Sequence, residues 1–194
     1  MRHHVRATRA PGVQTRRTLL DASWELFAAR GLTGVSLGEI AAAADCFPSQ
    51  VTYYFGTKEA LFAEAACRET VRLAERIEAV GAGARSPRWY ARAMARESLE
   101  SPALPAFCEA LLIARQNPAV QQLVSKTLDQ LREEGARAIE ALWARKGWQL
   151  SAPPRATARV MWATALGLVV EHVGTPIDPD AAESAIYTAL GSTK

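Results

Sequence analysis

A run of hydrogen-bonding side chains after Pro48 is the part of this 194-residue sequence that most clearly carries chemistry. Its polar members are Ser49, Gln50, Thr52 and Tyr54, and none of them is acidic. A Gln amide can pair with adenine in a major groove, and a Thr methyl group can contact a thymine methyl group. With Val51 as an apolar anchor, the run predicts a short helix that reads base edges.

The segment before this run has the features of a supporting helix. Ser36 is a good N-cap, and Glu39 three residues later completes a capping box. Small and apolar residues then recur at helical spacing, namely Ile40, Ala41 and Ala44. Asp45 tolerates the left-handed backbone of a tight turn, and Pro48 suits the first position of the next helix. Two helices joined in this way form a helix-turn-helix, which holds one helix in a major groove.

Enzymatic chemistry has little support in the sequence. A nucleophilic Cys67 or Cys108 with His172 as its base is conceivable, but no local signature accompanies it. His3 and His4 could bind a metal only weakly, and no Cys, His or Asp cluster has the spacing of metal ligands. No glycine-rich phosphate loop follows a strand. We therefore expect a protein that is not an enzyme and that has no metal and no cofactor.

Composition places the chain among globular proteins, with 49% hydrophobic and 22% charged residues. The longest apolar run, residues 160–170, is too short to span a membrane, and the N-terminus lacks the apolar core of a secretory signal. Three cysteines, an odd number without paired spacing, indicate free thiols in a reducing compartment. We expect a cytoplasmic protein.

Positive charge is concentrated at the N-terminus. Residues 1–17 contain no acid, and their arginines are Arg2, Arg6, Arg9, Arg16 and Arg17, so the formal net charge of +3 leaves a negative remainder. Residues 1–12 are predicted to form a flexible basic arm. This arm either touches the phosphate backbone or minor groove of DNA or is a disordered end without a function.

The rest of the sequence predicts helices and no sheet, because period-two alternation is absent. Proline stands at or near most predicted starts, and glycine follows several predicted ends. Besides the two short helices, the expected helices cover residues 13–30, 58–80, 87–99, 102–116, 118–146, 154–173 and 179–190. The expected fold class is therefore all-α, with about nine helices.

Residues 15–61 resemble the DNA-binding domain of the TetR (tetracycline repressor-like) family of bacterial regulators. The resemblance is carried by L-L-D-A-S-W-E-L-F-A-A-R-G at 19–31, V-S-L-G-E-I-A-A-A-A at 35–44 and V-T-Y-Y-F-G-T-K-E-A-L-F at 51–62. It implies a three-helix helix-turn-helix domain, residues 13–60. A long helix would join this domain to a C-terminal ligand-binding and dimerisation domain, residues 61–194.

The resemblance also implies DNA-backbone contacts at Tyr54 and Lys58, and Tyr53 and Thr57 suit the same role. The full set of expected DNA contacts is Thr15, Arg17, Ser36, Phe47, Pro48, Ser49, Gln50, Thr52, Tyr53, Tyr54, Thr57 and Lys58.

Two positions depart from the family pattern, which usually has Gly where Asp45 stands and commonly Ser or Ala where Phe47 stands. Phe47 cannot accept a hydrogen bond at the start of the reading helix, an expected loss of about 1 kcal/mol unless another group substitutes. Phe47 is either an apolar packing residue or a groove contact, and Tyr53 is either a core aromatic or a DNA contact.

The C-terminal half supplies candidates for a ligand cavity, which members of the family commonly carry. The candidate lining residues are Trp89, Met94, Phe107, Leu111, Trp143, Trp162 and Leu166, with Tyr90 beside them. Each could instead be plain core, because aromatics at helical spacing usually pack. Glu109, Arg115 and His172 could orient a largely apolar effector, although exposed or structurally paired roles suit them better.

Residues 160–170 are apolar almost all round, so both sides of this helix need cover, and a second subunit can supply one of them. The resemblance implies a homodimer through the last two long helices, and an inverted-repeat operator follows from its symmetry. We expect a transcriptional repressor that a small molecule releases from DNA. Two alternatives remain: an effector-independent regulator or activator, and a helical ligand-binding or enzymatic domain whose helix-turn-helix no longer binds DNA.

Overall fold

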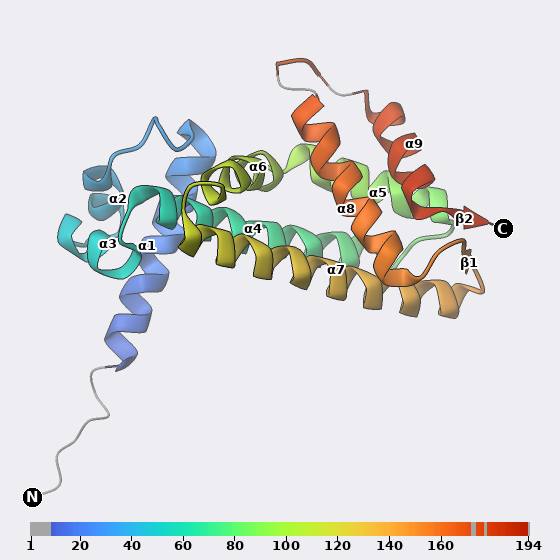
Figure 1. Ribbon diagram of the computed structural model, residues 1–194, viewed down its shortest axis with the longest axis horizontal. Coiled ribbons are helices and arrows are strands. Elements are labelled where there is room, and N and C mark those ends of the chain that lie inside the picture. Colours follow the sequence, from blue (N-terminus) through green and yellow to red (C-terminus); the bar gives the residue numbers. More distant parts are fainter. Residues whose placement is uncertain (1–8, 172–173, 177, 194) are drawn as a thin grey trace, which may run out of the picture.

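The computed structural model describes residues 9–171, 174–176 and 178–193. Within them nine helices form an elongated molecule, with α1, α2 and α3 at one end and α5, α8 and α9 toward the other (Figure 1). The helices are α1 (Arg9–Arg30), α2 (Leu37–Ala43), α3 (Pro48–Phe55), α4 (Lys58–Gly81), α5 (Pro87–Glu100), α6 (Ala103–Ala114), α7 (Pro118–Lys146), α8 (Pro154–Glu171) and α9 (Pro179–Leu190). The all-α class expected from the sequence is confirmed.

The long helices α4 and α7 run side by side along the molecule and connect its two ends (Figure 1). The Thr57 hydroxyl caps α4 by accepting a hydrogen bond from the Ala60 N–H at 3.1 Å. The Asn117 side chain caps α7 by accepting two backbone N–H bonds. α7 ends at Lys146, and its C-cap residue Gly147 has a left-handed φ of 68°, which suits a residue without a Cβ.

Buried side chains form two clusters that divide within α4. The first includes Phe27, Ile40 and Val51, continues along the first turns of α4, and extends into α6 and the start of α7. The second joins the later turns of α4 to α5, α7, α8 and α9 around Trp143. On α4 the change from one cluster to the other falls between residues 67 and 73, whereas the domain boundary expected from the sequence is at residue 60.

Most predicted helix bounds agree with the structure to within two residues, but the start of the first helix is wrong. α1 begins at Arg9 rather than at residue 13, so Pro11 and Gly12 lie inside it, and the arm predicted for residues 1–12 is helical from Arg9. Proline is tolerated in a first turn because the N–H groups there have no intrahelical acceptor. Residues 1–8 lie outside the described part of the chain.

The structure also contains a short strand pair that the sequence did not predict. β1 (Gln149–Leu150) pairs antiparallel with β2 (Ser192–Thr193), with Gln149 opposite Thr193. Two residues are too few to produce a visible alternation of apolar and polar positions. The pair ties the segment after α7 to the segment after α9.

α8 is covered on one side and open on another. Met161, Trp162 and Ala165 are buried, whereas Val160 and Val170 are 50% and 59% exposed. Among the described residues, no helix is both long enough and apolar enough to cross a lipid bilayer.

Candidate functional site

The supporting helix α2 begins in a closed hydrogen-bond network. The Ser36 Oγ accepts from the Glu39 N–H at 3.2 Å, and the Glu39 carboxylate accepts from the Ser36 N–H at 2.8 Å. Arg30 donates to the same carboxylate at 2.8 Å. The bonds from Ser36, followed by that from Arg30, lower the pKa of Glu39 to about 2. The predicted capping box is confirmed, and the Ser36 hydroxyl is engaged in it.

The turn and the start of α3 also follow the sequence prediction. Asp45 has a left-handed backbone with φ of 51°, and Pro48 is the first residue of α3. Phe47 occupies the N-cap position without a side-chain hydrogen bond. Gln50 compensates from the other direction, because its Oε1 accepts a bond from the Phe47 N–H at 2.9 Å. Gln50 therefore satisfies the backbone N–H of Phe47, while the Gln50 N–H itself bonds the Phe47 carbonyl at 2.9 Å.

The outer face of α3 is open to solvent. Its side chains Pro48, Ser49 and Thr52 are exposed, while Val51 is 1% exposed and anchors the helix. Phe47 is 76% exposed and Tyr53 is 82% exposed. The sequence left two alternatives for each residue: Phe47 as an apolar packing residue or a groove contact, and Tyr53 as a core aromatic or a DNA contact. The packed Phe47 and the buried Tyr53 are therefore wrong. Both aromatic rings belong to the solvent-facing surface.

Tyr54 lies deeper than the sequence suggested. It is half-buried, and its ring meets those of Tyr53 and Phe55 edge-on at centroid distances of 5.0 and 6.5 Å. A Cβ atom added to Gly12 would lie 3.3 Å from the Tyr54 hydroxyl. Residues three apart share a helix face, so Tyr54 lies on the side of the buried Val51. Tyr54 is therefore less accessible than Ser49 and Thr52, the exposed polar residues of the same helix.

The start of α4 places a cation beside the reading helices. The Lys58 Nζ donates to the Val35 carbonyl at 2.8 Å, and Lys58 is half-buried. The Thr57 hydroxyl, already engaged as the α4 cap, lies next to it in the chain. In this arrangement Lys58 ties α4 to the start of α2 while keeping a positive charge at that end of the molecule.

Two arginines of α1 have different surroundings: Arg16 contacts other helices, whereas Arg17 lies on the surface. Arg16 pairs with Glu64 at 2.5 Å and lies over the Phe55 ring at 4.8 Å, so it joins α1 to α3 and α4. Arg17 is exposed and only 3.9 Å from Asp21, while Thr15 is half-buried. Of the two cations, Arg17 is the more accessible to a DNA phosphate, because 70% of its side chain is exposed against 42% for Arg16.

The predicted ligand residues of the C-terminal half are mostly packed core. The buried members are Met94, Phe107, Trp143 and Trp162; Leu111 and Leu166 are half-buried, and Trp89 is 38% exposed. Trp143 meets Tyr90 and Trp148 edge-on at 5.3 and 5.2 Å. These large rings contribute most to stability when fully packed, which explains why they fill the core.

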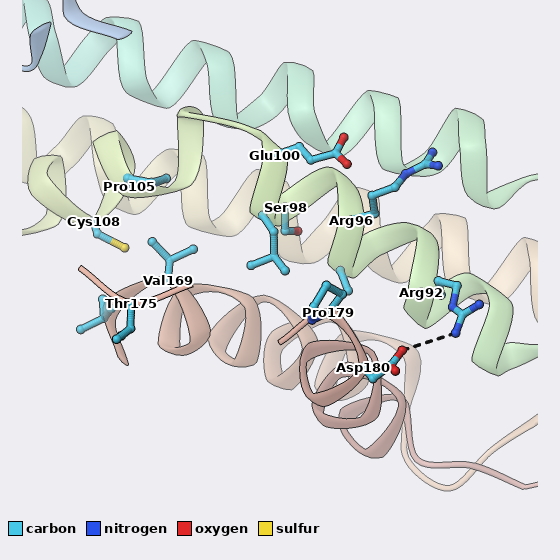
Figure 2. A pocket seen from close by; sticks show the side chains of 13 residues that line it. Arg92, Arg96, Ser98, Glu100, Pro105, Cys108, Val169, Thr175, Pro179 and Asp180 are labelled. Atoms are coloured by element: carbon cyan, nitrogen blue, oxygen red, sulfur yellow. Dashed lines mark ion pairs between the residues drawn. The ribbon is translucent and has the colours of Figure 1, made fainter. Parts of the chain in front are cut away.

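A cavity of about 870 Å³ opens instead between α5, α6 and the facing ends of α8 and α9 (Figure 2). Its lining residues are Arg92, Ala95, Arg96, Ser98, Leu99, Glu100, Pro105, Cys108, Val169, Val170, Thr175, Pro179 and Asp180. None of the seven predicted ligand residues is among them. The wall of this cavity consists of smaller side chains, while Trp162 borders a separate, smaller hollow with Tyr90.

Two polar side chains of the cavity wall are buried to different degrees. The Ser98 Oγ is buried and has no hydrogen-bond partner within the described part of the chain. Cys108 is half-buried, and burial raises the pKa of its thiol, which keeps it protonated at neutral pH. The apolar part of this wall, with its one unsatisfied hydroxyl, suits a mainly apolar molecule that carries a single hydrogen-bonding group.

Three of the four charged residues of the wall, Arg92, Arg96 and Asp180, take part in ion pairs. Arg92 donates to Glu183 and lies 3.6 Å from Asp180, an ion pair drawn in Figure 2. Burial by itself would raise the pKa of Glu183, but the hydrogen bonds from Arg92 and Arg88 outweigh it and lower that pKa. Arg96 is paired with Glu97 at 3.4 Å. The cluster holds α5 to α9 beside the cavity.

Sequence reasoning missed Ser98 and Cys108 as cavity residues. A weak signal existed in α5, where the small residues Ala91, Ala95 and Ser98 recur at helical spacing along a buried face. Of the predicted orienting groups, Glu109 is half-buried and Arg115 is exposed at the end of α6. His172 lies outside the described residues.

The open face of α8 continues into α9 as a shallow groove. It is lined by Ser151, Val160, Thr164, Ala181, Ser184, Ala185, Thr188, Ala189 and Gly191. These side chains are small, so another helix pair could approach them closely. Within the described residues, no group of three His, Cys, Asp or Glu side chains is placed to hold a metal ion.

Comparison with known proteins agrees with this geometry. A family model described as "Bacterial regulatory proteins, tetR family" matches residues 19–65, and one described as "Bacterial transcriptional repressor C-terminal" matches residues 87–190. A transcriptional regulator from Rhodococcus sp. RHA1 is 32% identical, with a TM-score of 0.82 over 90% of this chain and 94% of that chain. No curated protein matches the chain in sequence.

Two further solved structures share the fold at lower identity. A TetR-family regulator from Rhodococcus sp. is 24% identical, with a TM-score of 0.69 over 91% of this chain and 96% of that chain. A regulator from Saccharomonospora viridis in complex with choline is 19% identical, with a TM-score of 0.65 over 91% of this chain and 95% of that chain.

The helix-turn-helix, its solvent-facing reading helix and the helical second half define a DNA-binding transcriptional regulator. The chain belongs to the TetR family of bacterial regulatory proteins. Membership of that family implies DNA binding and dimerisation.

Proposed function

We propose that the protein is a cytoplasmic, homodimeric repressor that leaves an inverted-repeat operator when a small molecule fills the cavity beside α5 and α6. Residues 13–60 bind DNA, residues 61–194 bind the effector and dimerise, and residues 1–12 contribute a basic segment. The exposed face of α3 reads bases, and nearby cations bind phosphates, which supply most of the affinity.

The observation that carries this proposal is the position of α6 between the cavity and the DNA-binding end. One side of α6 contributes Pro105 and Cys108 to the cavity wall. Another side places Phe107 in the same buried cluster as Phe62 and Ile40 of the DNA-binding end. A molecule that displaces α6 therefore acts directly on the packing that supports the reading helices.

The coupling is thermodynamic and requires two states. An effector can shift the protein away from the DNA-binding state only by the difference in its affinity for the two states. Because α6 also packs along α4, a shift of α6 moves α4, the helix that connects the DNA-binding end to the rest of the molecule. In the dimer, a change in the direction of α4 alters the separation of the two recognition helices.

The wall of the cavity indicates the class of effector. Leu99, Val169 and Pro179 give it an apolar surface, and Ser98 offers one hydrogen bond. Its arginines are already paired with carboxylates, so we expect a largely apolar molecule with one hydroxyl or carbonyl group. The choline complex of the Saccharomonospora viridis regulator supports a small-molecule site in this fold.

The groove of small residues along α8 and α9 is the proposed dimer surface. Val160 at its edge is 50% exposed, and Ala181 and Ala185 permit close approach of a second helix pair. A two-fold dimer through this surface pairs each residue with its symmetry mate and places two reading helices on one face.

Fluorescence anisotropy with the DNA that flanks the protein's own gene tests the DNA-binding part of the proposal. We expect tight binding that weakens steeply with salt. Lys58→Ala should flatten the salt dependence by about one charge, whereas Gln50→Ala should weaken only the preferred sequence. Lys126→Ala, which removes an exposed cation on α7, is the matched control.

Equal and weak binding to every duplex would show that this DNA lacks the operator or that the motif is inactive. A selection from genomic fragments then separates these two cases. Failure to enrich any fragment would contradict the repressor function.

A further inference from the structure

We propose that Phe47 and Gln50 act as one unit that selects a thymine in each half-site. The Phe47 ring contacts the thymine methyl group, and the Gln50 amide donates to the thymine O4. This inference rests on the proposed DNA-binding function and adds a base identity to it.

The orientation of the Gln50 amide is fixed by hydrogen-bond chemistry. The Phe47 backbone N–H is a donor, so the atom that faces it at 2.9 Å must be the amide oxygen, Oε1. Phe47 offers no side-chain acceptor at this N-cap, so Gln50 provides the side-chain bond here. Within the described part of the chain, the Gln50 amide nitrogen donates to no protein group.

This orientation changes the base that Gln50 can read. A bidentate contact to adenine needs the amide oxygen and nitrogen side by side at the base edge, and here the oxygen faces the Phe47 N–H instead. The –NH₂ group remains for DNA, and it requires an acceptor. In the major groove, acceptors without an adjacent donor are found on guanine (N7 and O6) and on thymine (O4).

Phe47 favours thymine over guanine. Its side chain is 76% exposed directly before α3, although a phenyl ring gains free energy when it leaves water. Thymine is the base that presents an apolar group, its C5-methyl, beside an acceptor in the major groove. Because the hydrogen bond folds the Gln50 side chain back toward Phe47, the ring and the amide are placed to reach one base pair.

Modified bases can test the two contacts separately. Operator duplexes would first be selected from a randomised library with the full-length protein. Each thymine would then be replaced by uracil, which removes only the methyl group, or by 5-methylcytosine paired with guanine. The second change keeps the methyl group and replaces the O4 acceptor by an amino donor. At one thymine per half-site, we expect each change to weaken binding on the order of tenfold.

Protein variants assign each contact to its residue. Phe47→Ala should bind the thymine and uracil duplexes equally while still discriminating against 5-methylcytosine. Gln50→Glu keeps an acceptor for the Phe47 N–H but has no donor, so its preference should move from thymine to cytosine, whose N4 is a donor. Lys126→Ala is the control, because this exposed residue on α7 lies outside the reading helix and should change neither ratio.

The outcomes distinguish this inference from the function on which it rests. A library that yields no enriched duplex overturns DNA binding and the inference together. Enriched duplexes whose preference is insensitive to Gln50→Glu overturn the inference alone. So does an adenine at the position where Gln50→Ala acts, because it would restore the bidentate contact.

Discussion

The two functional regions of this molecule are built in different ways. The DNA-reading end comes largely from one continuous segment, residues 36–58, whose caps and turn are satisfied by neighbours in the chain. The cavity is assembled from five separate parts of the sequence between Arg92 and Asp180. A surface made by local structure can be changed one contact at a time, whereas the cavity depends on how distant helices pack.

The largest effect is expected at Phe107, which joins the cavity helix to the core of the DNA-binding end and is fully buried. Phe107→Ala should lower the free energy of unfolding by about 3–5 kcal/mol, because it removes a packed ring and leaves a cavity. Urea denaturation measures this loss in the free energy of unfolding. Leu112→Ala on the same helix, where the side chain is 65% exposed, is the control and should cost under about 1 kcal/mol. Equal losses in both variants would show that α6 is not the structural link.

Removal of the α2 cap should have a smaller and local effect. Ser36→Ala loses the hydroxyl that accepts from the Glu39 N–H, at an expected cost of about 1 kcal/mol. Thermal unfolding measures the loss, and Ser49→Ala, at an exposed position on α3, should be close to neutral. If the two variants unfolded alike, the hydrogen-bond network at Ser36 would not stabilise this end.

A change of opposite sign is expected at the turn. Asp45 holds a left-handed backbone with φ of 51°, which glycine adopts without a Cβ penalty. Asp45→Gly should therefore stabilise the protein by about 0.5 kcal/mol, the gain in the turn being partly offset by the freer unfolded chain. Asp45→Ala keeps the Cβ atom and should destabilise it. Denaturant unfolding measures the change in the free energy of unfolding of each variant. If both changes had the same sign, the left-handed backbone of Asp45 would not be their cause.

The smallest effect is the pH dependence at Glu39, whose carboxylate is exposed. Its pKa is lowered from 4.5 to about 2, so the folded state favours the ionised form. The stabilisation is present above pH 4.5 and is lost as the pH falls toward 2. Glu39→Gln should flatten the stability curve over that interval. Unfolding measured between pH 2 and pH 6 would contradict this if the slopes of variant and parent were the same.

Features that depend on near neighbours in the chain could be predicted from the sequence, whereas features that depend on contacts between distant segments could not. The capping box at Ser36, the left-handed Asp45 and the first position of Pro48 depend on near neighbours and could be predicted. The exposure of Phe47 could not, because residue type favours burial and only the folded surface leaves that ring uncovered. The hydrogen bond from the Phe47 N–H to Gln50 satisfies one backbone donor at the start of α3.

The wall of the cavity is the part of the candidate site that could not be predicted from the sequence. Large rings such as Trp143 are predicted as ligand contacts, yet their size also makes them effective core-filling residues. The space remains where helices meet through smaller side chains such as Ala95 and Ser98. Which small residues face a void depends on packing between α5, α6, α8 and α9, and no local spacing encodes it.

The most direct test of the coupling between the two regions is the operator affinity in the presence of a cavity ligand. A compound library would be screened for raised melting temperature, and anisotropy would then measure operator binding with and without each stabilising compound. We predict that a compound whose binding is weakened by Ser98→Ala lowers operator affinity at least about tenfold in the unmodified protein, a coupling of roughly 1.4 kcal/mol. A compound that binds through Ser98 and leaves operator affinity unchanged would contradict the account.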